Sequence, residues 1–182
     1  MQMARVRQLV GEMLIWCLVV LVGSGAFLAY HYTPSGRMVN YGGSYPPLGD
    51  VPISGAYDSI LRLSVDVPGG VIVRELHYNA SILFALGIVV WILLGRYRHG
   101  LIALGLAALG TLAGFGAVDD LLSGTPLGEV PVVVWYGTHL LVALALGAVL
   151  VISSYREAKE QPRTLAFITL SAALTALVLY WA

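Results

Sequence analysis

The chain has 182 residues, of which 58% are hydrophobic and 11% are charged, and its ten basic and ten acidic residues balance to a net charge of zero. Soluble globular domains carry about 25% charged residues, so the composition excludes that class. The balanced charge also argues against the basic face of a nucleic-acid-binding protein, so we expect an integral membrane protein with no nucleic-acid partner.

Five apolar segments are long enough to cross a hydrocarbon core, which takes about 20 helical residues. They are residues 9–30, 77–94, 101–118, 132–152 and 165–181. Backbone groups inside a bilayer must be hydrogen-bonded within their own segment, and these segments do not alternate apolar and polar residues as barrel strands do. The sequence therefore predicts an all-α integral membrane protein that forms a single membrane domain over residues 1–182.

The basic residues predict how these helices are oriented in a cell membrane. Seven of them fall on one side of the membrane: Arg5, Arg7, Arg96, Arg98, Arg156, Lys159 and Arg163. Three fall on the other side: Arg37, Arg62 and Arg74. The positive-inside rule then places the N-terminus in the cytoplasm and residues 33–73 on the outer side of a multi-pass protein.

The segment at 33–73 is the one substantial stretch expected outside the membrane. Residues 33–55 are rich in Gly, Pro and Ser, which predicts a loop. The stretch "AYDSILRLSVDV" that follows mixes apolar with charged residues, which indicates a short helix lying on the outer surface.

Two of the four histidines lie within apolar segments toward the outer side. His77 opens the segment 77–94, and His139 lies about two turns into the segment 132–152. Both segments run inward in an up-and-down bundle, so the two imidazoles fall at comparable depth. A histidine inside a membrane can simply bond to a neighbouring helix. A pair at one depth can also hold a metal or a haem iron from opposite sides, and both readings stay open on these residues alone.

Glycines recur at a spacing that suits a large flat ligand. Gly11 and Gly25 are 14 residues apart, and so are Gly100 and Gly114. Fourteen residues is close to four helical turns, so each pair marks two levels on one helix face. A glycine lets a macrocycle approach the backbone, but small residues also serve ordinary packing of membrane helices.

Together these residues resemble the N-terminal half of cytochrome b, the transmembrane diheme subunit of quinol:cytochrome c oxidoreductases. The resemblance covers most of residues 11–153, through the glycines, "GAFLAYHYTP", "LLSGTPLG" and, most specifically, "AYDSILRLSVDVPGGVIVRELHYNAS". It implies an up-and-down four-helix haem bundle, followed here by a fifth transmembrane helix. It also implies one haem b on the outer side, with iron ligation by His77 and His139, close approach at Gly25 and Gly114, and propionate pairing by Arg74.

The positions at which this chain departs from cytochrome b predict that it lacks the inner haem and a complete outer quinol site. Trp91 and Ser153 stand where the family has the two ligands of an inner haem, so no inner haem is expected, although Gly11 and Gly100 of that level are present. The family's run at the outer quinol site reads "GFGAVDD", and the C-terminal half of the family is not matched. We therefore expect no bifurcated quinol oxidation by this chain alone.

The resulting hypothesis is a non-catalytic electron-transfer subunit of an oxidoreductase complex. Electrons would pass between the outer haem and a cytochrome c or iron–sulfur protein, with quinone as the other terminus if another chain completes its site. Two alternatives stay open: a haem-free structural or assembly subunit, and a haem b membrane anchor of the hydrogenase or formate dehydrogenase type. The extra loop at 37–53 is read either as a docking site or as an inert insertion, and Asp119 and Asp120 as a proton port or as ordinary solvated residues.

Overall fold

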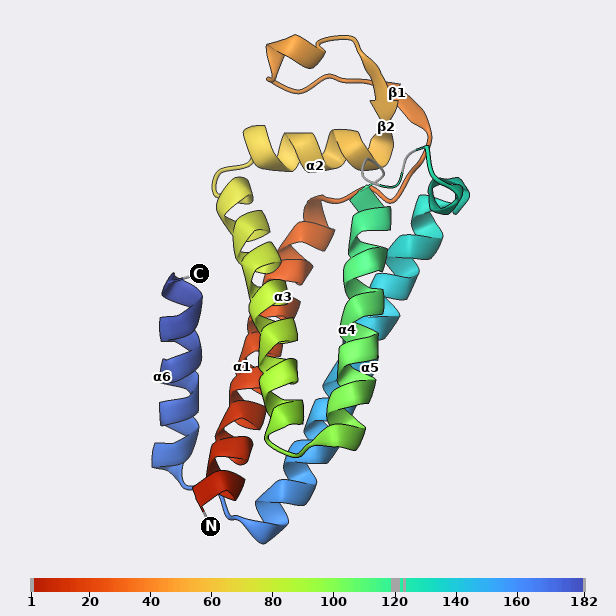
Figure 1. Cartoon of the computed structure of the whole chain (residues 1–182). Coiled ribbons are helices and arrows are strands. Elements are labelled where there is room, and N and C mark those ends of the chain that lie inside the picture. The colour runs from red at the N-terminus through yellow and green to blue at the C-terminus, as the bar shows by residue number, and fades with distance from the viewer. Residues whose placement is uncertain (1, 119–121, 123, 182) are drawn as a thin grey trace.

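The computed structural model describes residues 2–118, 122 and 124–181 and confirms the all-helical membrane fold (Figure 1). Asp119 and Asp120, and any role in proton movement, lie outside the described residues. The long helices are α1 (Gln2–His31), α3 (Gly70–Leu93), α4 (Tyr97–Val118) and α5 (Val132–Glu160), followed by α6 (Leu165–Trp181).

The four long helices form an up-and-down bundle built from two tight pairs. α1 packs most extensively on α3, and α4 packs most extensively on α5. The pairs meet more loosely along two seams, α3 with α4 and α1 with α5. It follows that α3 lies diagonally opposite α5, and α1 diagonally opposite α4.

Side-chain size explains this pairing. α3 buries Ala80, Phe84, Ile88 and Trp91 at the three- and four-residue spacing of one helix face. α4 buries mainly glycine and alanine, which let its backbone approach α5 closely. The inward faces are therefore bulky on α3 and flat on α4.

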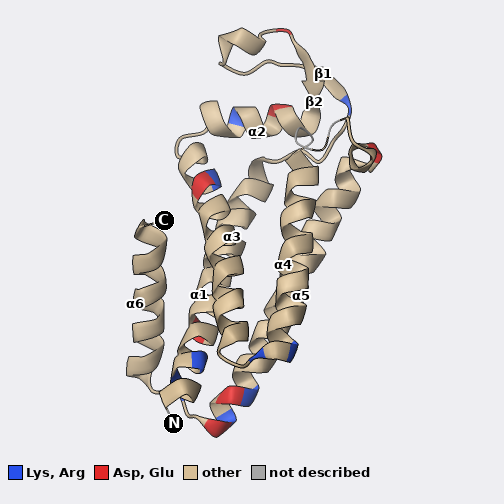
Figure 2. Ribbon diagram, viewed as in Figure 1, with Lys and Arg blue, Asp and Glu red and all other residues tan. Residues whose placement is uncertain are grey.

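Charge is confined to the two ends of the bundle, and the central part of every long helix is free of it (Figure 2). Within the described residues, four helices are long and apolar enough to cross a membrane. The fifth, α6, has 17 residues and would rise about 26 Å, slightly less than a hydrocarbon core of about 30 Å. α6 packs mainly against α1, outside the four-helix bundle.

A small cap covers the end of the bundle that the positive-inside rule predicts to lie outside, which is called the outer end below, with the opposite end called the inner end. The predicted surface helix is α2 (Gly55–Val65), whose first turn is capped by the Ser54 hydroxyl accepting from the Tyr57 N–H. The stretch predicted as loop also contains a two-stranded antiparallel hairpin, β1 (Met38–Asn40) with β2 (Pro52–Ser54). Strands of three residues are too short to show an alternating pattern in the sequence.

The corner between α2 and α3 fixes the outer end of α3. Gly69 has a φ of 79°, in the left-handed region that favours glycine. Gly70 lies so close to the Leu63 carbonyl that a Cβ atom at this position would collide with it. The two glycines therefore let α2 turn directly into α3, on which Arg74 and His77 follow.

Candidate functional site

His77 and His139 face each other across the outer half of the bundle. They lie on the diagonal helices α3 and α5, and their ring centroids are 6.1 Å apart with the planes tilted by 55°. Both side chains are half-buried. The structure thus brings together the two residues that the sequence put forward as a ligand pair, and their ligand role stays a prediction.

Each ring is hydrogen-bonded through its Nδ1 atom. His77 Nδ1 is 2.9 Å from the Ser24 hydroxyl on α1, and His139 Nδ1 is 2.8 Å from the Gly110 carbonyl oxygen on α4. The His77 ring also has a backbone hydrogen bond to Leu21. An imidazole has two nitrogens, so a ring that is hydrogen-bonded through Nδ1 can bind a further ligand through Nε2.

The two predicted close-approach glycines lie against these rings. A Cβ atom on Gly25 would come within 3.2 Å of His77 Cε1, and one on Gly114 within 3.3 Å of His139 Cε1. Gly25 is on α1 and Gly114 on α4, the other diagonal of the bundle. The outer level thus has imidazoles on one diagonal and bare backbone on the other.

Arg74 lies one turn before His77, exposed at the outer end of α3. Its Nη1 atom donates to the Ser64 hydroxyl on α2 at 3.0 Å. In the part of the chain that the structure describes, no carboxylate pairs with Arg74. The guanidinium therefore has donors free for an anionic group near the mouth of the bundle.

The inner level of the bundle is filled by side chains of the protein itself. Trp91 is 1% exposed and packs on Gly11, where a Cβ atom would come within 3.3 Å of the indole Nε1. Ser153 is fully buried and accepts from Arg96 twice, at its hydroxyl (3.0 Å) and at its carbonyl (3.1 Å). Ile92 occupies the space beside Gly100.

Two ion pairs, each between a buried glutamate and a partly exposed arginine, tie the inner helix ends together, and sequence reasoning missed both. Arg7 on α1 pairs with Glu157 on α5 at 2.7 Å. Arg163, just before α6, pairs with Glu12 on α1 at 2.8 Å. Four charged residues distributed over distant segments carry no local pattern, so only their meeting in the fold identifies the pairs.

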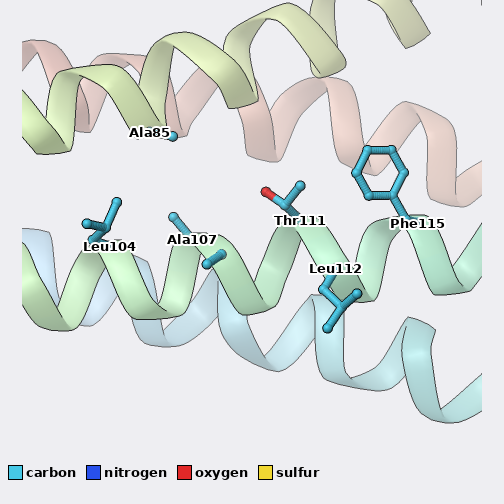
Figure 3. Close-up of a pocket in the computed structure, with 7 residues that line it drawn as sticks. Ala85, Leu104, Ala107, Thr111, Leu112 and Phe115 are labelled. Atoms are coloured by element: carbon cyan, nitrogen blue, oxygen red, sulfur yellow. The ribbon is translucent and has the colours of Figure 1, made fainter. Parts of the chain in front are cut away.

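Apolar grooves run along both loose seams. The groove between α3 and α4 has a volume of about 400 Å³ and is lined by Ala85, Leu104, Ala107, Ala108, Thr111, Leu112 and Phe115 (Figure 3). The groove between α1 and α5 has a volume of about 250 Å³. Since Phe115 directly follows Gly114 and Thr111 directly follows Gly110, the first groove adjoins the backbone that flanks His139.

No protein-family model matches the chain. It is similar to curated cytochrome b subunits of cytochrome bc1 complexes. The subunit of Mycobacterium tuberculosis is 37% identical over 131 residues, which cover 65% of this chain and 24% of that protein. The subunit of Streptomyces coelicolor is 33% identical over 129 residues (64% and 24%), and that of Corynebacterium diphtheriae is 32% identical over 131 residues (65% and 24%).

These matches confirm the resemblance seen in the sequence and define its extent. The chain spans about a quarter of the length of the curated relatives it matches. With its apolar helices, this makes it a multi-pass membrane protein that is homologous, over most of its own length, to a part of cytochrome b.

Proposed function

We propose that this chain is a membrane-bound, cytochrome b-like subunit of a bc1-type complex and relays electrons through one haem b held by His77 and His139. The 6.1 Å between the imidazole centroids carries the proposal. Two metal–imidazole bonds of roughly 2 Å, with each ring centre about 1.2 Å behind its nitrogen, would separate the centroids by about 6.4 Å. The two rings already stand close to the separation that one shared iron requires.

The surroundings of the rings also fit a haem. Gly25 and Gly114 leave bare backbone beside the imidazoles, where any larger residue would press on them. The seam between α3 and α4 contains an apolar groove that reaches Phe115, next to Gly114, so the surroundings of the site are apolar, as a haem requires. A bound haem b supplies reversible one-electron transfer, with a potential set by its axial ligands, its burial and nearby charge.

Each protein group then has a defined task. His77 and His139 would hold the iron, and their Nδ1 hydrogen bonds would keep both rings in place. Arg74, which has no carboxylate partner among the described residues, would pair with a propionate at the outer mouth. The apolar helices would exclude water from the site.

One haem, not two, is supported by the state of the inner level. Trp91, Ile92 and the Arg96–Ser153 contact fill the space between the inner helix ends. Neither an indole nor a serine hydroxyl is among the usual axial ligands of a haem iron. The inner half would thus serve to hold the helices together rather than to carry electrons.

Partners and orientation follow from charge and from homology. The seven basic residues at the inner ends support a cytoplasmic N-terminus, and the haem would then lie toward the outer side. The relatives are subunits of cytochrome bc1 complexes, so the redox partner would be an outer cytochrome c or iron–sulfur protein. Quinone would exchange electrons with the haem at the other end of the electron-transfer path, if a neighbouring chain completes the quinone site.

The test is a pyridine haemochromogen assay on the purified chain beside His77→Ala, His139→Ala and, as a control, His99→Ala. His99 lies at the opposite end of the bundle, at the start of α4. We expect one haem b per polypeptide in the wild type and in the control, and none in the two site variants. A wild type without haem would overturn the proposal in favour of a structural subunit, and two haems would overturn the single-haem assignment.

A further inference from the structure

Ser24 makes a contact whose consequence extends beyond packing. It is a buried serine on α1, directly before Gly25, and its hydroxyl oxygen is 2.9 Å from His77 Nδ1. A serine in a membrane helix commonly bonds only to its own helix. Here the same hydroxyl reaches back to Val20 and across to a histidine on another helix.

The hydrogen bonds around Ser24 favour one position for the proton of the His77 ring. The hydroxyl has one hydrogen, and the Val20 carbonyl, 2.7 Å away, can only accept it. The Leu21 carbonyl, 3.2 Å away, is a second acceptor for the same hydrogen. When the hydroxyl donates to either carbonyl, the lone pairs of its oxygen face His77, and Nδ1 of that ring is then the donor. A neutral imidazole that carries its proton on Nδ1 has an unprotonated Nε2, which is the form that binds a metal.

His139 is placed in the same tautomer by different chemistry. Its Nδ1 lies 2.8 Å from the Gly110 carbonyl oxygen, which can only accept. A backbone carbonyl cannot be removed by changing a side chain, and His77 also has a backbone hydrogen-bond partner at Leu21. The Ser24 hydroxyl is the side-chain contact of His77 Nδ1 that mutation can remove.

We propose that Ser24 is a positioning residue for the haem, which fixes the tautomer and orientation of His77 and increases the electron donation of its Nε2 to the iron. The proposal rests on the proposed function, since it requires a haem between His77 and His139. An Nδ1–H that donates to an acceptor gives the imidazole partial anionic character. This favours the oxidised iron and lowers the midpoint potential of the one-electron couple.

The experiment compares the purified wild type with Ser24→Ala, Ser24→Thr and Ser171→Ala. Threonine keeps a hydroxyl at position 24. Ser171 is a fully buried serine on α6 whose hydroxyl donates to Ile168 in its own helix, so its loss matches the loss of a buried hydroxyl without touching a histidine. Haem content, the midpoint potential from a redox titration, and the electron paramagnetic resonance spectrum of the oxidised form are measured for each.

We expect one haem per chain in all four proteins, with a midpoint potential that rises in Ser24→Ala only. Loss of haem in Ser24→Ala with retention in Ser24→Thr would also support the role of the hydroxyl. An unchanged or lowered potential in a fully loaded Ser24→Ala protein would overturn the inference and leave the proposed function standing. Haem loss in both Ser24→Ala and Ser24→Thr would overturn it too, because Ser24→Thr keeps the hydroxyl and would still have lost the haem. A wild type without haem overturns the proposed function and this inference with it.

Discussion

The outer and inner halves of the bundle use the same four helices in opposite ways. In the outer half, two imidazoles stand 6.1 Å apart beside glycines, with grooves along the adjoining seams. In the inner half, Trp91 and Ile92 fill the corresponding space, and ion pairs join the helix ends. At both levels a side chain lies against each glycine, an imidazole in the outer half and an indole or Ile92 in the inner half, so the glycines alone do not make a site and the chemistry of the facing side chain distinguishes the two halves.

The outer half can be tested first by closing it. Gly25→Leu adds a branched side chain where even a Cβ atom would lie 3.2 Å from the His77 ring. We expect haem per polypeptide to fall at least roughly tenfold, which corresponds to a loss of about 1.4 kcal/mol or more in binding free energy. The measurement is the haemochromogen assay.

Gly23→Leu is the matched control for that change. Gly23 lies on the same helix, and nothing lies within 4 Å of the position that its Cβ atom would take. It should keep full haem content. Equal losses in Gly23→Leu and Gly25→Leu would show that glycine matters to α1 as a whole rather than to the haem level.

The inner half can be tested by replacing the side chains that stand where a second haem would need its ligands. The double variant Trp91→His, Ser153→His removes the indole and the hydroxyl that binds Arg96, and supplies two imidazoles at that level. We expect the haem content to rise from one toward two per chain, because Gly11 and Gly100 are still present. Each single variant should stay at one haem, and a double variant that also stays at one would show that Ile92 and Arg96 keep the level closed.

The inner ion pairs should contribute more stability than the outer one. In Glu157→Gln, Arg7 loses a partner that is 3% exposed. We expect the free energy of unfolding to fall by about 2 kcal/mol, below the 3–5 kcal/mol of a fully buried pair because Arg7 is partly exposed. Denaturation with sodium dodecyl sulfate in mixed micelles, followed by tryptophan fluorescence, measures it, and no change would contradict a stabilising role.

The smallest effect is expected at the outer surface. Arg62 in the last turn of α2 and Asp66, which directly follows the helix, are 3.9 Å apart, and the Arg62 side chain is 57% exposed. Arg62→Gln should change the same unfolding free energy by less than about 0.5 kcal/mol. A loss as large as that of Glu157→Gln would remove the proposed contrast between the two ends of the molecule.

The helices of this fold could be predicted from the sequence because apolar length is a direct requirement of the bilayer. The predicted ends were less accurate, since the apolar segments mark only the part inside lipid. α1 begins at Gln2 rather than near residue 9, and α5 continues to Glu160 rather than 152. These extensions carry Arg7 and Glu157, so the ends are helical where tertiary ion pairing holds them.

The candidate site could be predicted only in part. His77, His139, Gly25 and Gly114 stand at spacings that identify a shared level, and the structure brings all four together. Ser24 escaped notice because a serine in a membrane helix looks like a residue bonded to its own turn. The contact between Arg96 and Ser153 escaped as well, since it depends on how closely the α3–α4 connection approaches α5.

The corner formed by Gly69 and Gly70 has a mechanical consequence. Because the Leu63 carbonyl lies directly against Gly70, backbone contact sets how α3 leaves α2 at this corner (Figure 1). His77 lies seven residues beyond Gly70, about 10 Å along α3. A partner that displaced α2 would therefore act first on the end of α3 that carries His77.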